Sequence, residues 1–166
     1  MLVLVSQLVG RSLITFDDAE PIGVLRDPII DPANGKIVGY FFGQGFMFMK
    51  QVILAADDIV GYDEQRIVVQ KVDVARQAHE EPKINGVLEQ KIPVLGAHVI
   101  TESGRNLGRA NDLLLDTELN MVVRYYVHGL MQDRIIAAEH IIRIEKRGII
   151  IDDAAPSTAA MAVETT

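Results

Sequence analysis

Residues 137–151 read AAEHIIRIEKRGIII, and residues 55–69, 82 positions earlier, read AADDIVGYDEQRIVV. Four of the fifteen positions are identical, and five more exchange only Asp for Glu or Val for Ile. Self-similarity at a fixed spacing is typical of a duplicated structural unit. The stretch therefore predicts that the chain builds the same small fold twice.

The match extends upstream, so that the repeat covers residues 5–70 and 88–153. The aligned positions are Gly10 with Gly96, Ile22-Gly23 with Leu107-Gly108, Asp27 with Asp112, and Asp31 with Asp116. The first copy holds three extra residues within residues 43–50. Because insertions fall in loops, we expect a hairpin tip there.

The periodicity within each copy is that of β-strands. Runs rich in Val, Ile, Phe and Tyr occupy residues 22–25, 37–42, 52–54 and 67–69, separated by Gly, Asp, Asn and Pro. No stretch shows a sustained 3.6-residue apolar stripe, so the chain is predicted to be all-β. Short strands in a copy this small do not bury both faces as an open sheet. We therefore expect two tandem small closed β-barrels related by internal pseudo-symmetry.

Local signals support this reading. DPANGK at residues 31–36 predicts a hairpin in which Asn34-Gly35 supplies positive φ values, and Asn120 is the counterpart of Gly35 in the second copy. Residues 55–57 and 137–139 interrupt the strand pattern and predict a single helical turn before a final hairpin in each copy.

The domain boundaries follow from the repeat. The first barrel is expected at residues 1–72, a linker at 73–87, the second barrel at 88–153 and a disordered tail at 154–166. Pro82 and Asn85-Gly86 indicate the linker, with one helical turn before the proline. Residues 1–5 are expected to form a buried strand.

Each barrel is expected to have its own core. The residues predicted for the first core are Ile22, Val24, Ile37, Ile59, Ile67 and Val69. Those predicted for the second are Leu107, Val122, Ile141, Ile149 and Ile151.

The charge and composition exclude several classes of protein. The net charge is −7, with 6 basic and 10 acidic side chains in residues 1–75 and 10 and 13 in residues 76–166. An acidic chain without a basic run is unsuited to direct nucleic-acid binding. The chain has no Cys, which removes disulfides and thiolate metal sites. The apolar start, MLVLVSQLVGR, is too short to span a membrane, so we expect a cytoplasmic protein.

No residue pattern predicts a catalytic, cofactor or metal site. The His residues at positions 79, 98, 128 and 140 lack metal-binding spacing. The repeated acids Asp27, Asp31, Asp112 and Asp116 could act as acid and base, but turn capping explains them better. The Ser residues lack a nucleophile-elbow context. We therefore expect no enzyme.

The segment YFFGQGFMFMK at residues 40–50 holds four of the five Phe in the chain. Alternation places Phe46 and Phe48 on one face and Met47 and Met49 on the other. A barrel strand needs one apolar face only, so something must cover the second. We interpret this segment as a partner-binding surface made of Tyr40, Phe41, Phe42, Phe46, Met47, Phe48 and Met49.

The order of features in each copy resembles the PRC-barrel domain family. The features are a strand beginning at Gly, an Ile-Gly or Leu-Gly pair, an Asp four residues later, a turn and two further hairpins. The family includes the cytoplasmic part of the photosynthetic reaction centre H subunit and the C-terminal barrel of RimM-type ribosome maturation factors. The resemblance covers about 130 of the 166 residues as two tandem copies. It implies a binding role and no catalytic residues.

Three hypotheses follow for the function. The first is a non-enzymatic interaction or assembly scaffold that docks a protein partner, or a second copy of itself, through the apolar hairpin. The second is a RimM-like ribosome-associated RNA-processing factor that acts by binding a basic ribosomal protein. The third is an enzyme or small-ligand carrier that uses a groove between the barrels.

Overall fold

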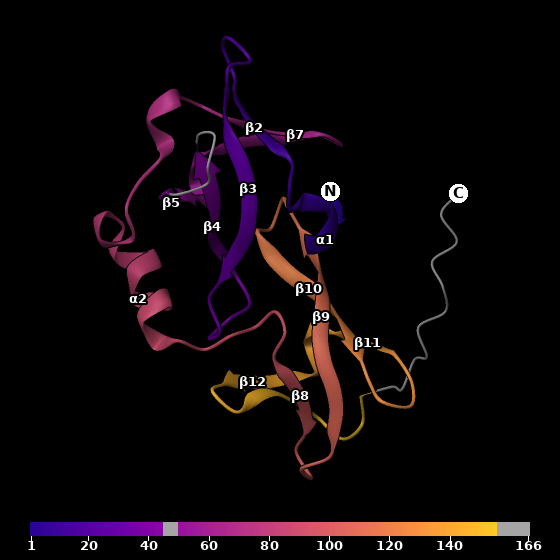
Figure 1. Ribbon diagram of the computed structural model, residues 1–166. Coiled ribbons are helices and arrows are strands. Elements are labelled where there is room, and N and C mark those ends of the chain that lie inside the picture. The colour runs from indigo at the N-terminus through magenta and orange to yellow at the C-terminus, as the bar shows by residue number, and fades with distance from the viewer. Residues whose placement is uncertain (45–49, 156–166) are drawn as a thin grey trace.

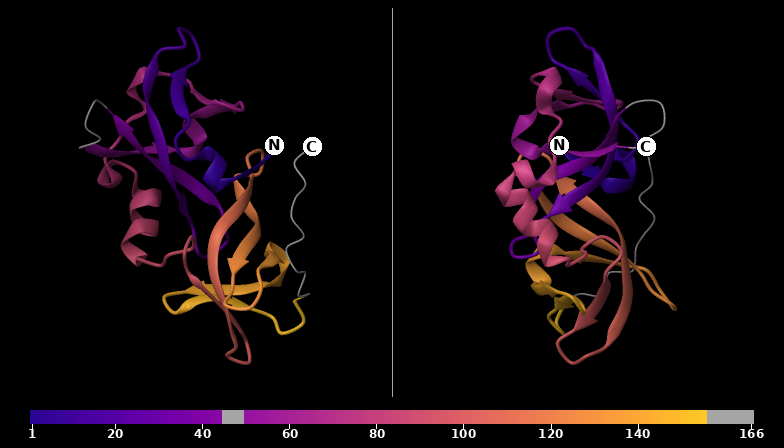
Figure 2. Two further views of the ribbon diagram at one scale, coloured as in Figure 1. Left: turned by 45° about the vertical axis from the view of Figure 1, so that its right-hand side comes forward. Right: turned by 60° about the vertical axis from the view of Figure 1, so that its left-hand side comes forward.

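A computed structural model of the chain describes residues 1–44 and 50–155. The fold is mostly β, with two sheets that lie one above the other along the long axis of the molecule (Figure 1; Figure 2). The strands of the first sheet are β2 (Ser12–Thr15), β3 (Pro21–Ile30), β4 (Ile37–Gln44), β5 (Lys50–Ala55), β6 (Ile59–Tyr62) and β7 (Arg66–Val69). Those of the second are β8 (His98–Thr101), β9 (Asn106–Asp116), β10 (Met121–His128), β11 (Arg134–Ala137), β12 (Ile141–Glu145) and β13 (Gly148–Ile151).

The repeat in the sequence becomes a repeat in topology. The strand orders are β5-β4-β3-β2-β7-β6 and β11-β10-β9-β8-β13-β12. In both sheets the strand that opens the copy pairs parallel with the strand that ends it, whereas the other pairs are antiparallel. The expected helical turns are present as η1 (Ala56–Asp58) and η4 (Ala138–His140), and each leads into the final hairpin. The all-β expectation is thus confirmed.

The barrels, however, are not closed. Among the described residues, no ladder joins the two outer strands of either sheet path. In the first copy the outer edge of β5 is bonded instead to the segment that follows β7. Ile53 N–H donates to the Arg76 carbonyl at 2.9 Å, and Arg76 N–H donates back at 3.1 Å. The expectation of closure was wrong here because the linker occupies the edge that closure requires.

The two copies meet through their corresponding turns. The predicted hairpin at residues 31–36 is present, although Gly35 alone has a positive φ (71°), and Asn120 has the same conformation at φ 49°. Ile37 N–H donates to the Asn120 carbonyl at 2.8 Å, and Val122 N–H donates to the Gly35 carbonyl at 3.0 Å. Equivalent residues of the two copies therefore exchange a reciprocal pair of hydrogen bonds.

The main apolar core is one continuous cluster with residues from both sheets, so the expectation of a separate core in each copy was wrong. The predicted core residues that are buried are Ile37, Ile67, Val69, Leu107, Val122, Ile149 and Ile151. Ile22, Ile59 and Ile141 are partly buried against the cluster, and Val24 is half-buried. Val3 and Val5, at the start of the chain, belong to the same cluster as strands of both copies.

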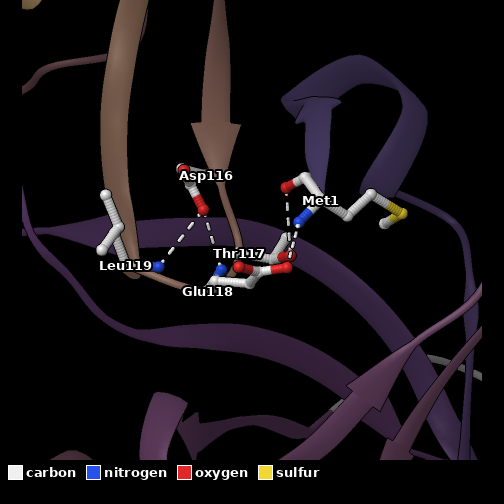
Figure 3. A network of polar contacts seen from close by, with 5 residues as sticks. All are labelled: Met1, Asp116, Thr117, Glu118 and Leu119. Atoms are coloured by element: carbon white, nitrogen blue, oxygen red, sulfur yellow. Dashed lines mark hydrogen bonds and ion pairs between the residues drawn. The ribbon is translucent and has the colours of Figure 1, made fainter.

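The start of the chain joins the second sheet. β1 (Leu2–Leu4) pairs antiparallel with β9, and the short helix α1 (Val5–Leu8) follows it. Figure 3 shows the polar contacts at Met1: the Thr117 hydroxyl donates to the Met1 carbonyl at 3.1 Å, and the Met1 ammonium contacts Glu118 at 3.3 Å. This crossing of the first residues to the second copy explains why the copies share one core.

The expected linker is more structured than the sequence predicts. It forms two 3₁₀ turns, η2 (Val72–Val74) and η3 (Ala78–Glu80), and then the helix α2 (Pro82–Gln90). Pro82 begins this helix, where its missing N–H costs nothing, and Lys91 ends it in the left-handed conformation at φ 52°. None of the helices described is long and apolar enough to cross a membrane.

Candidate functional site

Strand β4 is covered on both faces by its own chain. Residues 37–40 and Phe42 are buried without the alternation of a half-exposed strand. Helix α2 lies against the first sheet, as Figure 1 shows at the left of the molecule. A second apolar cluster, separate from the main core, forms beneath it from Ile29, Val38, Ile53 and Ile84, with Phe41, Ala55, Ala78, Val87 and Leu88 packed against them. The cover that the apolar face of β4 needs is therefore the α2 segment.

Gly39 is what allows α2 to approach. A Cβ at this position would lie 3.0 Å from Ile84 Cδ1 and 2.5 Å from the Leu54 carbonyl oxygen. Ile84, on α2, is only 2% exposed. The absence of a side chain at Gly39 thus leaves room for Ile84, the buried side chain of the helix.

The opposite face of β4 points into the main core. Tyr40 and Phe42 are fully buried there, and the Tyr40 and Tyr62 hydroxyl oxygens are 3.2 Å apart. Burial raises the pKa of Tyr40, and the nearby Tyr62 raises it further; burial also raises the pKa of Tyr62. Both phenols therefore stay neutral to a higher pH than a solvent-exposed tyrosine does. Tyr40 and Phe42 were expected in a partner surface, but as core residues they have no exposed surface to offer.

Phe41 alone, of the described residues in that predicted surface, is partly exposed. It lies on a groove of about 650 Å³ between the end of β3, the neighbouring β4 and α2 with the chain that follows it. The residues lining the groove are Asp27, Pro28, Ile29, Ile30, Phe41, Val87, Leu88, Lys91, Ile92, Pro93, Val94 and Leu95. We call this site the α2 groove.

The chemistry of the α2 groove is that of a binding surface. Its lining is mainly aliphatic, with one aromatic ring from Phe41. Among the described residues of the lining, Asp27 and Lys91 alone are ionisable, and both are exposed. The described lining residues offer no nucleophile with a base, and they form a surface that can hold an apolar side chain.

The remaining residues of the predicted surface, Phe46, Met47, Phe48 and Met49, lie outside the described residues. They connect β4 to β5, whose facing ends Gln44 and Lys50 are paired. Their part in an interface stays a prediction.

The repeated acids have different environments. Asp31 Oδ1 accepts from Ala33 N–H at 2.9 Å, and Asp116 Oδ1 accepts from Glu118 N–H at 2.9 Å, as expected of turn residues. Asp112 instead accepts from Ser6 N–H at 3.1 Å, which ties α1 to β9. Asp27 lies on the α2 groove.

The structure brings two of the four His together, which sequence reasoning missed. His98 and His128 line one cavity on the second sheet, although 30 positions separate them. Strand register alone reveals this, because both pair with Arg109. His140 bonds Asp152 at 3.0 Å elsewhere, and His79 lies on η3. Within residues 1–44 and 50–155 no three His, Asp or Glu side chains gather as metal ligands do.

No model of a known protein family matches the chain, and no curated protein matches it. The resemblance to the PRC-barrel family therefore rests on the repeated residues alone.

Proposed function

We propose that the protein is a non-enzymatic interaction or assembly module built from two PRC-barrel-like copies. The observation that carries the proposal is the α2 groove, an apolar depression that the rest of the described chain leaves open. It lies on the strand that leads into the apolar segment of residues 45–49. An apolar depression of this size suits one or two large side chains of a partner.

The physical reason for a partner is the cost of leaving large apolar side chains in water. Each of Phe46, Met47, Phe48 and Met49 contributes about 1.5–3 kcal/mol when fully buried. The sequence places them next to Phe41, in a protein whose other apolar faces are largely buried in two clusters. A protein partner, or a second copy of the chain, would bury them together with the groove.

The net charge of −7 also supports a second candidate, a RimM-like factor that holds a basic ribosomal protein. This candidate uses the same surface and differs only in the partner. Co-sedimentation of the purified protein with ribosomal subunits would favour it, and self-association without ribosome binding would favour the assembly module.

Substitution of the apolar hairpin tests the interaction proposal. Phe46→Asp and Phe48→Asp should leave the circular dichroism spectrum and melting temperature nearly unchanged and should abolish assembly, measured by light scattering coupled to gel filtration. The matched control is Leu130→Asp in the equivalent hairpin of the second copy, where Leu130 is fully exposed. This control should change neither fold nor assembly.

Two results would count against the proposal. The first is a wild type that is monomeric at micromolar concentration and binds no ribosomal subunit, together with a clearly lower melting temperature in the Phe46→Asp and Phe48→Asp variants. These two observations would show that the rings stabilise the fold of the monomer. Equal loss of assembly in the Leu130→Asp control would assign the effect to added charge and not to this hairpin.

A further inference from the structure

Three side chains form a row across the outer face of the second sheet. His98 on β8 and His128 on β10 are both the cross-strand neighbours of Arg109 on β9. Cross-strand neighbours have Cβ atoms about 5 Å apart on one face of a sheet, so the three side chains start from adjacent positions. They line a cavity of about 530 Å³ whose lining residues are His98, Asn106, Leu107, Gly108, Arg109, Asn111, His128 and Leu130.

The first copy shows that the fold does not need this row. The register there pairs Val24 with Ser12 and Gly43, so the same three positions carry no charge and no ring. The backbone is alike at this point. A Cβ on Gly23 would meet the Gly43 carbonyl, and a Cβ on Gly108 would meet the His128 carbonyl. The same backbone arrangement thus carries residues without charged or ring side chains in the first copy and three side chains with hydrogen-bond donors in the second.

The neighbours of His98 determine which of its nitrogens carries hydrogen. Asn106 Oδ1 accepts from Gly108 N–H at 3.0 Å, which orients the amide and directs its NH₂ group to His98 Nδ1 at 3.1 Å. Nδ1 is therefore an acceptor, and the neutral imidazole carries its hydrogen on Nε2. His98 presents a donor to the cavity.

The other two members of the row are also held in place. One terminal nitrogen of Arg109 donates to the Gly96 carbonyl at 2.9 Å, which anchors the guanidinium and leaves its other N–H groups for a ligand. His128 Nδ1 is 2.7 Å from Asp133 Oδ1, so this carboxylate orients the imidazole ring. Its negative charge also offsets part of the positive charge that Arg109 brings to the cavity. A register shift between Tyr126 and Val127 adds Asn111, another amide, to the lining.

We propose that this cavity is an oxyanion-binding site that takes a carboxylate or a phosphate on Arg109, His98 and His128. A guanidinium with flanking N–H donors matches the geometry of these anions, and charge-assisted hydrogen bonds are about twice as strong as neutral ones. The site is on the second copy and is independent of the α2 groove.

The test is a titration followed by ¹H–¹⁵N correlation spectra. Sodium phosphate and sodium acetate are added separately, with sodium chloride at matched ionic strength as the reference. Either anion should cause saturable shifts at the amides of Gly108, Arg109 and His128, and none at Ser12, Val24 and Gly43. Saturation by phosphate alone assigns a phosphate ligand, and saturation by acetate alone assigns a carboxylate.

Arg109→Gln should weaken binding by about tenfold, the effect of losing one charge-assisted hydrogen bond. The first copy has Val at this position, so the variant should fold. The matched control is Arg143→Gln, an exposed arginine of β12 that pairs with Glu145 and lies outside the cavity lining; its binding should equal that of the wild type. Absence of saturable shifts with both anions, or equal affinity in Arg109→Gln, would overturn the proposal.

Discussion

Replacement of Ile84 by Ala tests whether α2 is part of the folded protein. Ile84 is 2% exposed and packs on Ile29, Val38 and Ile53. The change deletes three buried carbons, at about 0.8 kcal/mol each, and leaves a cavity that raises the loss to about 3 kcal/mol. Ala favours a helix by up to about 0.5 kcal/mol, so the free energy of unfolding should fall by about 2.5 kcal/mol.

Urea unfolding followed by circular dichroism measures this loss, and the melting temperature should drop by about 5–10 °C for a chain of this size. The matched control is Ile142→Ala, the same chemical change at a side chain that is 43% exposed, where the loss should stay below about 1 kcal/mol. If Ile84→Ala cost no more than this control, α2 would be a solvated linker, and the wall of the α2 groove would be lost with it.

Three further predictions concern the second copy. Gly108→Ala should destabilise the protein by roughly 1–3 kcal/mol more than Gly104→Ala in urea titrations. Both glycines have positive φ, but of the two only Gly108 lies so close to a carbonyl, that of His128, that a Cβ would meet it. Equal losses in the two variants would refute this close approach. Burial raises the pKa of Tyr125 to about 12, so the contribution of this residue to stability is constant below pH 10, where its folded and unfolded phenols are both neutral, and it falls by about 1.4 kcal/mol per pH unit between pH 10 and 12 as the unfolded phenol ionises. Tyr125→Phe should remove this part of the alkaline loss and leave the part due to Tyr40 and Tyr62, whose pKa values burial also raises. An identical pH profile in Tyr125→Phe and wild type would contradict this prediction. Deletion of Leu2–Leu4 should speed hydrogen exchange at the C-terminal end of β9, its pairing partner, and unchanged exchange there would refute the pairing.

The repeat made much of the fold predictable, because aligned residues have aligned roles. Gly10 and Gly96 both have positive φ, and their N–H groups donate to equivalent carbonyls, those of Leu25 and Ala110. Gly35 and Asn120 likewise share one turn conformation. A backbone conformation with positive φ requires particular residue types, mainly Gly and Asn, so aligned residues predict the same conformation in both copies.

Helix α2 was missed although its signal is in the sequence. Ile84, Val87 and Leu88 have the i, i+3, i+4 spacing of a helix with one apolar face. Pro82 and Gly86 are typical of a break in a helix, but a proline is favoured in the first turn, and packing on the sheet offsets the roughly 1 kcal/mol cost of a helical glycine. Packing against the sheet, and not local propensity, therefore determines that this segment is helical.

Contacts between distant segments were beyond a single sequence. The shared core depends on β1 joining the second sheet, and the row of Arg109 with His98 and His128 depends on strand register. Neither the pairing of β1 nor the strand register produces a periodic pattern in the sequence. The burial of Tyr40 and Phe42 was hidden for the same reason, since alternation gives two faces of a strand without saying which face meets the core.

Site-specific photo-crosslinking tests directly whether the α2 groove binds protein. A photoreactive amino acid replaces Lys91, an exposed residue of the groove lining, or Lys83, also an exposed lysine but one of α2 outside that lining. Both proteins are irradiated in native cell extract, with an excess of unlabelled wild type or of a Leu88→Lys variant as competitor. We predict one discrete adduct at position 91 that wild type displaces and Leu88→Lys does not, and no adduct at position 83. Equal labelling at both positions, or no adduct at position 91, would contradict protein binding in the α2 groove.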